Sequence, residues 1–362
     1  MAIDYDVIVV GSGFGGSVAA LRLTEKGYKV LVLEAGREFK DHEFAKSSWR
    51  VRDFLFAPAI GCYGIQRIHM LPDVMILAGA GVGGGSLVYA NTMYEPPAEF
   101  FAQGPWSGIT DWQTELKPFY DLARRMLGVE MNTYFSPADA AMKDVADRMG
   151  VGESFKLAPV AVHFGKGPGI ESPDPYFGGV GPARKGCTNC GECMTGCRHN
   201  AKNTLDKNYL ALAKLGGAEI KAMTTVTELI RAGDEWSVRT KKTGGFSKGT
   251  LRAKHVVVAA GTYNTQKILH RMKDEGLLPN LSERLGYLSR TNSEALVGAV
   301  ANNIPSPDFT RGVAITSSFF PDEHTHVEPV RYGIGSNSMG LLSTILTDGD
   351  DSKPRWKVWI SA

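Results

Sequence analysis

The sequence has no excess of charge of either sign and no long apolar run. Its 362 residues include 40 Lys and Arg against 38 Asp and Glu, which leaves a formal net charge of +2. Nucleic-acid-binding proteins gather positive charge into a patch or stripe, and no long basic run is present here, so we exclude nucleic acid as an expected partner. No apolar segment approaches the roughly 18 residues that a bilayer span requires. We therefore expect no transmembrane segment.

The sequence also lacks two features of a secreted protein, a basic N-terminal segment and dispersed cysteines. Residues 1–6 lack the basic segment that begins a secretory leader. Only five cysteines occur, and four of them fall within 187–197, unlike the even, dispersed cysteines of a secreted disulfide scaffold. We therefore expect a cytoplasmic protein, with peripheral contact to a membrane left open, and a local site at the cysteines.

Glycine, by contrast, is abundant. The 42 glycines make up about 12% of the chain, against a usual ~7%, and they gather at residues 11–16, 79–85 and 165–191. The whole chain is 43% hydrophobic and 22% charged, which is the composition of a globular protein. The length indicates two lobes, or one large domain with insertions. The backbone is therefore expected to approach another group closely at the glycine clusters.

Apolar patterning predicts a doubly wound α/β domain. Residues 5–10 are a β-branched apolar run typical of a buried parallel strand, and a helix over 15–26 and a strand over 29–33 complete a βαβ unit. Residues 254–260 form a second buried parallel strand that ends at Gly261 and returns to the same sheet. Further helices are expected over 111–127, 138–149 and 203–215, and several strands over 219–259.

A GxGxxG motif stands where a dinucleotide-binding turn belongs, directly after the first strand and at the start of the helix. Gly11 allows the tight turn, Gly13 allows the backbone to reach a pyrophosphate, and Gly16 allows close packing of helix on strand. Glu34, at the end of the second strand, is placed to accept hydrogen bonds from a ribose, and its charge argues against NADP. A glycine-rich turn without a ligand is the alternative.

A second glycine-rich segment separates FAD from NAD as the expected cofactor. Gly79, Gly83 and Gly84 lie in a loop of small residues that ends at Ser86. The backbone of such a loop can lie against a flat ring or a second stretch of an elongated cofactor. FAD needs such a surface and NAD does not. A flexible hinge is the alternative, although the apolar residues that follow tie the loop to the core.

These segments resemble the glucose–methanol–choline (GMC) flavoprotein oxidoreductases, and within them the bacterial cholesterol-oxidase-like branch. The resemblance spans roughly residues 5–290. It rests on the segments 9–16, 32–36, 79–91, 257–261 and 265–269.

The resemblance implies an FAD-binding domain over 1–286, with insertions at 37–78 and 100–160 and a cysteine-rich loop at 164–200, followed by the start of a substrate-binding lobe over 287–362. It implies that the ADP half of FAD lies at the N-terminal motif, that the isoalloxazine lies near the second glycine loop, and that Asn91 stands one position later than the family pattern. The residues predicted to bind FAD are Gly11, Ser12, Gly13, Phe14, Gly16, Glu34, Gly79, Gly83, Gly84, Ser86, Asn91, Val226 and Gly261.

The family oxidises an alcohol by hydride transfer to the flavin while a base removes the hydroxyl proton. Its usual catalytic histidine lies towards the C-terminus, whereas no histidine follows His326 here, so we expect the chain to be an N-terminal fragment. Glu328 lies near the stretch in which the cholesterol-oxidase-like branch carries a glutamate over the flavin. It is the candidate base, with an ordinary surface or paired carboxylate as the alternative. His324 and His326 are further substitutes, or exposed turn residues.

The cysteines have the spacing Cys187-x2-Cys190-x2-Cys193-x3-Cys197, which is that of bacterial ferredoxins. Arg198 replaces the proline of that pattern, and Cys62 is the candidate fourth ligand if Cys197 cannot turn inward. Three interpretations stay open: an iron–sulfur cluster, zinc or a redox disulfide, and reduced structural thiols. The last is preferred.

By resemblance, the predicted function is FAD-dependent oxidation of the CH–OH group of a bulky hydrophobic alcohol, with a 3β-hydroxysteroid as substrate and a role in steroid and lipid metabolism. Oxygen or an unknown carrier would accept the electrons. Two alternatives are an electron-transfer protein with flavin and an iron–sulfur cluster, and a catalytically incomplete FAD-binding fragment.

Overall fold

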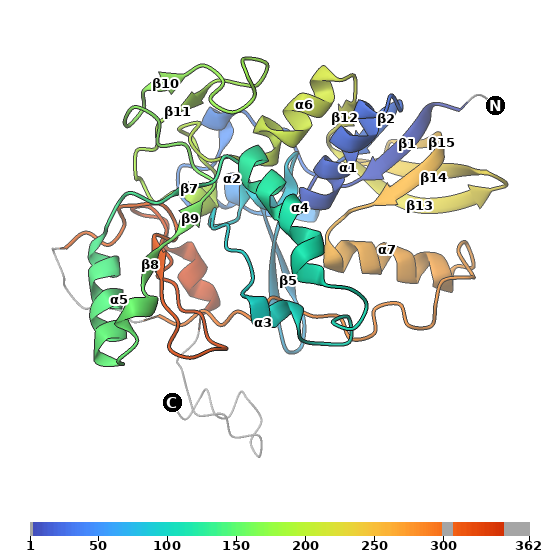
Figure 1. Cartoon of the computed structure of the whole chain (residues 1–362). Helices are drawn as coiled ribbons and strands as arrows, with labels where there is room; N and C mark the ends of the chain where they lie inside the picture. Colours follow the sequence, from blue (N-terminus) through green and yellow to red (C-terminus); the bar gives the residue numbers. More distant parts are fainter. Residues whose placement is uncertain (1–2, 299–306, 344–362) are drawn as a thin grey trace.

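The computed structural model of the chain describes residues 3–298 and 307–343, and its main feature is a six-stranded sheet in the order β12-β2-β1-β15-β14-β13 (Figure 1). Strands β12, β2, β1 and β15 are parallel, whereas β14 and β13 add antiparallel neighbours. The strands are β1 Tyr5–Val10, β2 Val30–Leu33, β12 Glu219–Lys221, β13 Thr224–Ala232, β14 Glu235–Lys242 and β15 Lys248–Val258. The predicted α/β class is confirmed.

Helices cover both faces of this sheet. Val7 and Val9 of β1 pack with α1 (Phe14–Glu25) and α6 (Tyr209–Leu215) in one core cluster. The alternate residues Ile8 and Val10 belong to the cluster on the other face, which includes residues of α7 (Thr262–Asp274). Because both faces are covered, every residue from Val7 to Val10 is buried, which explains why the strand has a continuous apolar sequence and not an alternating one.

Two expectations need correction. The helix predicted over 203–215 is broken into η6 (Leu205–Lys207) and α6, because Asn208 adopts a non-helical backbone (φ −137°, ψ −96°) and its side chain accepts the Tyr209 N–H. Residues 37–78, predicted to be irregular, contain paired strands. These are β3 Phe56–Ala57 with β4 Cys62–Tyr63, and the hairpin β5 Gln66–Met70 with β6 Met75–Gly79, alongside η1 Asp41–Glu43, α2 Val51–Phe54 and η2 Pro58–Ile60.

The remaining helices and short strands belong to the segments between the strands of the main sheet and to the segment 307–343. The helices predicted over 111–127 and 138–149 are confirmed as α4 Trp112–Met126 and α5 Pro137–Arg148. The remaining elements are η3 Gly84–Leu87, α3 Ala98–Phe101, β7 Glu130–Met131, η4 Gly152–Ser154, β8 Lys156–Leu157, β9 Pro159–Val160, β10 Glu171–Ser172, β11 Arg184–Lys185, η5 Cys193–Thr195, β16 Ser317–Ser318 and η7 Ser338–Leu342. Within the described residues, no helix is both long and apolar enough to cross a bilayer.

The segment 307–343 packs against residues of the middle of the chain. Val313, Ala314 and Ile315 share a buried cluster with residues of 158–201, and β16 pairs with β8. Asp139 of α5 accepts hydrogen bonds from the hydroxyls of Thr316 and Ser317. The predicted lobe over 287–362 therefore packs, in its described part, on residues of the segment predicted to bind FAD, and its residues 299–306 and 344–362 lie outside the described residues.

Candidate dinucleotide site and cysteine pocket

The GxGxxG turn has the geometry that its glycines predict. Gly11 has φ +99° and its N–H donates to the Leu33 carbonyl at 2.8 Å, so the turn is held to the end of β2. A Cβ on Gly11 would lie 2.4 Å from the Ala259 oxygen, and one on Gly16 would lie 2.0 Å from the Gly11 oxygen. A Cβ on Gly13, in contrast, would meet no atom within 4 Å. Two of these glycines are thus required by packing, and Gly13 faces open space at the N-terminus of α1.

The second glycine loop lies directly on this turn, a contact that the sequence did not predict. A Cβ on Gly84 would lie 2.5 Å from the Gly13 α-carbon, and the Gly83 N–H donates to Ser12 Oγ at 3.1 Å. The Ser86 hydroxyl donates to the Gly83 carbonyl at 2.7 Å and accepts the Leu205 N–H at 3.0 Å. Gly79 closes the loop, because a Cβ there would lie 2.2 Å from the Gly84 oxygen. Phe14, 41% exposed, packs edge-on against Tyr89 at 5.8 Å.

Glu34 joins three backbone segments. It is buried, and one carboxylate oxygen accepts hydrogen bonds from the Ser12 N–H at 3.1 Å and the Ser12 hydroxyl at 2.6 Å. The other oxygen accepts from Gly36 N at 2.9 Å and Gly81 N at 3.4 Å. A carboxylate offers about four acceptor positions, so a ribose hydroxyl would share or replace one of these donors. The sequence did not indicate this bridging role.

Asn91 presents unpaired polar atoms near the second loop. Its side chain is fully buried in a left-handed backbone conformation (φ +66°), and neither amide atom makes a hydrogen bond within the described ranges, although the amide lies beside the Cys193 thiol. Buried polar groups without partners are rare in folded proteins. The predicted site therefore fits a polar ligand here, since such a ligand would supply the missing partner.

The two remaining predicted contacts are Gly261 and Val226. Gly261 (φ +78°) is the N-cap of α7 and lies two residues after Ala259, whose N–H donates to the Val10 carbonyl at 2.8 Å. Val226 lies in β13. The first residue of this strand, Thr224, donates its N–H to the Glu34 carbonyl at 2.8 Å. The structure thus brings the carboxyl ends of β1, β2 and β15 together, where ligands of open α/β sheets bind.

Glu328 is half-buried. Burial, with the nearby negative charge of Glu294, raises the pKa of Glu328 to about 7. Its charge also acts on Tyr94, whose hydroxyl donates to Ser318 Oγ at 2.8 Å. Burial therefore favours the protonated, uncharged form of this carboxyl.

The histidines near Glu328 differ in their surroundings. His326 is exposed, and its ring stacks on Phe320 at 4.4 Å and meets Tyr94 edge-on at 4.7 Å. His324 is exposed beside Glu323. Only His326 therefore contacts the aromatic cluster next to Glu328.

The four clustered cysteines line one pocket. Burial raises the pKa of the Cys190 thiol to about 11 and also raises the pKa of the Cys187 and Cys193 thiols. All five cysteines are free. Cys62, on β4, does not line this pocket. Burial thus disfavours the charged thiolate form of Cys187, Cys190 and Cys193.

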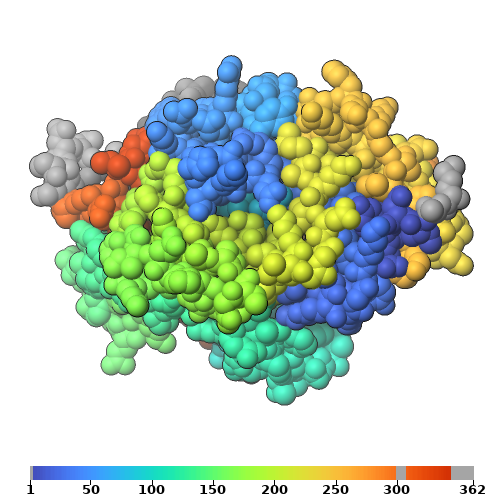
Figure 2. Space-filling model, turned by 90° about the horizontal axis from the view of Figure 1, so that it is seen from above, coloured from blue at the N-terminus to red at the C-terminus, as the bar shows by residue number. Residues whose placement is uncertain are grey.

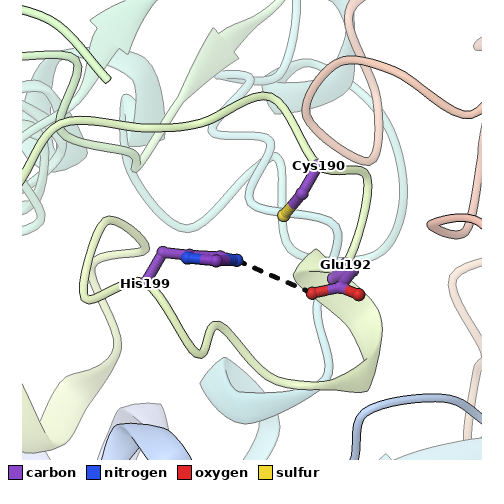
Figure 3. Close-up of side chains that lie close together, drawn as sticks. All are labelled: Cys190, Glu192 and His199. Carbon is purple, nitrogen blue, oxygen red and sulfur yellow. Dashed lines mark ion pairs between the residues drawn. The ribbon is translucent and has the colours of Figure 1, made fainter. Parts of the chain in front are cut away.

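Three further residues, Glu192, His199 and Lys202, line this pocket and were not predicted from the sequence. Glu192 and His199 lie beside Cys190, with 3.8 Å between His199 Nε2 and a Glu192 oxygen (Figure 3). Lys202 is fully buried, its Nζ lies 4.5 Å from the centre of the Tyr89 ring, and burial lowers its pKa to about 8. A glutamate, a histidine and a lysine usually lie at the surface, so only the short spacing to the cysteines could have indicated the first two.

Comparison with known proteins agrees with the motifs. The FAD binding domain model matches residues 6–49, and the GMC oxidoreductase model matches residues 180–273. The chain is 60% identical over 370 residues to a cholesterol oxidase of Mycobacterium tuberculosis (strain ATCC 25618 / H37Rv), covering 99% of this chain and 64% of that protein. It is 43% identical over 365 residues to a cholesterol oxidase of Acinetobacter baumannii, covering 98% and 65%.

More distant similarity extends to other alcohol oxidases. A long-chain-alcohol oxidase of Arabidopsis thaliana is 30% identical over 240 residues, covering 60% of this chain and 26% of that protein. A solved fungal aryl-alcohol oxidase superposes with a TM-score of 0.47 at 15% identity, over 75% of this chain and 48% of that one. The chain spans just under two thirds of the length of the two cholesterol oxidases. It belongs to the GMC oxidoreductase family and is similar to the bacterial cholesterol oxidases within it.

Proposed function

We propose that the protein binds FAD and oxidises the hydroxyl group of a bulky hydrophobic alcohol, with a 3β-hydroxysteroid as the substrate class. The observation that carries the cofactor assignment is the contact between the two glycine loops, in which Gly84 lies against Gly13 with no room for a side chain. The substrate class rests on the names of the two cholesterol oxidases.

The residues present fit FAD. The N–H groups at the start of α1 face open space at Gly13, where a pyrophosphate would find unpaired donors and the positive end of the helix dipole. Glu34 offers carboxylate oxygens to a ribose at the end of β2. Asn91 offers a donor and an acceptor that have no partner, and these are suited to the polar edge of an isoalloxazine. Gly261 follows the carboxyl end of β15, and Val226 lies two residues after Thr224, whose N–H donates to the Glu34 carbonyl.

When bound, FAD accepts the hydride from the alcohol carbon. Glu328 takes the hydroxyl proton in this proposal, because its raised pKa, about 7, allows it to hold and release a proton under neutral conditions. The rings of Tyr94, His326 and Phe320 contact one another and present a partly exposed aromatic surface, which suits a hydrophobic substrate. Oxygen is the proposed electron acceptor, since the relatives are named oxidases.

An anaerobic absorption spectrum of the purified chain, recorded before and after addition of a 3β-hydroxysterol, tests the proposal. Loss of the oxidised flavin bands on addition of sterol is expected, and their return on admission of oxygen identifies the acceptor. A Glu328→Gln variant, which keeps the shape of the side chain, is expected to retain the flavin and to reduce it more slowly. Flavin bands that sterol leaves unchanged in the wild-type chain would refute the substrate assignment while leaving FAD binding intact.

A further inference from the structure

Three side chains beside the cysteine pocket form a compact set of metal-ligating atoms outside the dinucleotide site. Cys190 Sγ, a carboxylate oxygen of Glu192 and a ring nitrogen of His199 all lie within 4.8 Å of one another (Figure 3). Glu192 is buried, and the other two residues are half-buried. We propose that Cys190, Glu192 and His199 bind a Zn²⁺ ion, with a fourth position open to water.

The donor set selects zinc. A thiolate and an imidazole are ligands that Zn²⁺ prefers, whereas Mg²⁺ and Ca²⁺ require oxygen donors. Bonds of about 2.0–2.3 Å to a tetrahedral Zn²⁺ place its ligand atoms roughly 3.3–3.7 Å apart. Glu192 and His199 already stand at 3.8 Å, so small side-chain movements complete the geometry. One thiolate and one carboxylate also neutralise the two positive charges of the ion.

The backbone holds these residues in place before any ion binds. Gly191 (φ +73°) leaves no room for a side chain, because a Cβ there would lie 2.3 Å from the Thr310 oxygen, and its N–H donates to the Gly312 carbonyl at 2.8 Å. A Cβ on Gly333 would lie 2.5 Å from Glu192 Cγ. The segment 310–333 therefore fixes the turn between Cys190 and Glu192, which lowers the conformational cost of binding.

The site also has polar neighbours suited to a metal-bound thiolate and carboxylate. The Thr188 hydroxyl is buried near Cys190 and has no hydrogen-bond partner among the described residues, so it is free to donate to a metal-bound thiolate. Arg198 donates to Glu192 at 2.5 Å, so this guanidinium orients the carboxylate and competes with the ion for its charge. Outer partners of this kind tune metal affinity. We therefore expect removal of the Arg198 charge to strengthen Zn²⁺ binding.

The loop that carries these residues is accessible. Figure 2 shows the chain around residues 160–200, in green, at the surface next to the blue N-terminal segment, where a Cβ on Gly196 would lie 2.3 Å from the Phe44 ring. His199 itself is 40% exposed. An ion can thus reach the site without unfolding of the sheet core.

Metal analysis of the purified full chain tests the site. The chain is stripped with a chelator, loaded with Zn²⁺ or Co²⁺, desalted, and assayed for bound metal, with flavin content recorded on each sample as a measure of folding. One equivalent of Zn²⁺ is expected, and Co²⁺ should give both a thiolate charge-transfer band and ligand-field bands at longer wavelengths than flavin absorbs. Cys190→Ser should remove the charge-transfer band. His199→Asn and Glu192→Gln should each weaken Zn²⁺ binding by at least about tenfold, the smallest loss typical of changes around a zinc site.

Cys62→Ser is the matched control, because Cys62 is buried but does not line the pocket. Equal Zn²⁺ affinity in this control and the wild type is expected. Absence of stoichiometric Zn²⁺, or binding unchanged in both Cys190→Ser and His199→Asn, overturns the proposal. Iron with acid-labile sulfide, lost in Cys187→Ser and retained in His199→Asn, would overturn it in favour of a four-cysteine cluster.

Discussion

The Lys202 ammonium donates a hydrogen bond to the Leu87 carbonyl at 3.0 Å, which ties the cysteine-rich loop to the end of the second glycine loop, 115 residues earlier in the chain. The same Nζ donates to the Cys193 carbonyl at 2.8 Å. A buried lysine thus holds the cysteine-rich loop against the second glycine loop, which contacts the dinucleotide turn. The position of the glycine loop thus depends on a residue far from it in sequence.

Replacement of Lys202 by methionine should destabilise the chain. The two carbonyls would lose their donor, and an unsatisfied buried polar group costs about 1–3 kcal/mol. We expect a fall of this size in the free energy of unfolding, measured by chemical denaturation at pH 7, together with weaker FAD binding. Lys166→Met, at an exposed position, should change little. Equal stability of the two variants would contradict the role of Lys202.

The same lysine should give a pH dependence to stability. Burial lowers its pKa in the folded chain to about 8 from its ordinary value of 10.5. Between these values the unfolded chain binds a proton that the folded chain does not, so the contribution of Lys202 to stability rises with pH from about 8 to 10.5. The difference in unfolding free energy between wild type and Lys202→Met should therefore increase across this interval. A constant difference would show that Lys202 titrates normally.

Gly13→Ala should separate folding from cofactor binding. The backbone at Gly13 (φ −71°, ψ −165°) suits alanine, and its Cβ would meet no atom within 4 Å in the ligand-free chain. The same Cβ would occupy the space that a pyrophosphate needs, so FAD affinity, measured by fluorescence titration, should fall at least about tenfold, or 1.4 kcal/mol. Gly15→Ala, also in open space, is the control and should bind FAD normally.

Glu34→Gln should weaken both the fold and the cofactor site. Four donors meet this carboxylate, and hydrogen bonds to a charged group contribute about 1.5–3 kcal/mol. Because the amide offers one acceptor oxygen in place of two, we expect a loss of about 1–3 kcal/mol in unfolding free energy. Glu38→Gln, which breaks only an exposed ion pair, should cost less than about 1 kcal/mol. Equal losses in thermal or chemical denaturation would refute the bridging role.

Glu328 should make stability fall as pH rises. Its folded pKa, about 7, lies above its ordinary 4.5, so between these values the folded chain holds a proton that the unfolded chain has released. The Glu328→Gln variant lacks this effect and should be more stable than wild type at pH 8, by up to roughly 3 kcal/mol, but not at pH 4. Glu323→Gln, at an exposed position, should follow the wild type at both pH values.

Activity should show the opposite trend with pH. Only the ionised Glu328 carboxylate accepts the hydroxyl proton, so the rate of flavin reduction by sterol should rise as pH increases through about 7. Glu328→Gln should lose this rise along with most of the rate. Stopped-flow reduction under anaerobic conditions measures both, and a pH profile unchanged in the variant would assign the base to another group.

The sequence by itself determined the βαβ unit and its ligand-binding turn. Val7 to Val10 are apolar because helices cover both faces of the strand, and the glycines at 11, 16 and 84 are required by contacts that leave no room for a Cβ. These features are local or depend on residue size, so they leave a clear pattern in the chain. The same holds for α4 and α5, whose apolar spacing predicted them.

Only the tertiary structure decided which distant groups meet. The four donors around Glu34, the burial of Lys202 and the set formed by Cys190, Glu192 and His199 arise where separate loops pack together. The break at Asn208 was missed because a single polar side chain captures the next N–H and interrupts an otherwise apolar pattern. Glu328 gains its raised pKa from burial by neighbours in space. Burial and long-range contacts set the chemistry of polar residues, and neither can be predicted from a local sequence pattern.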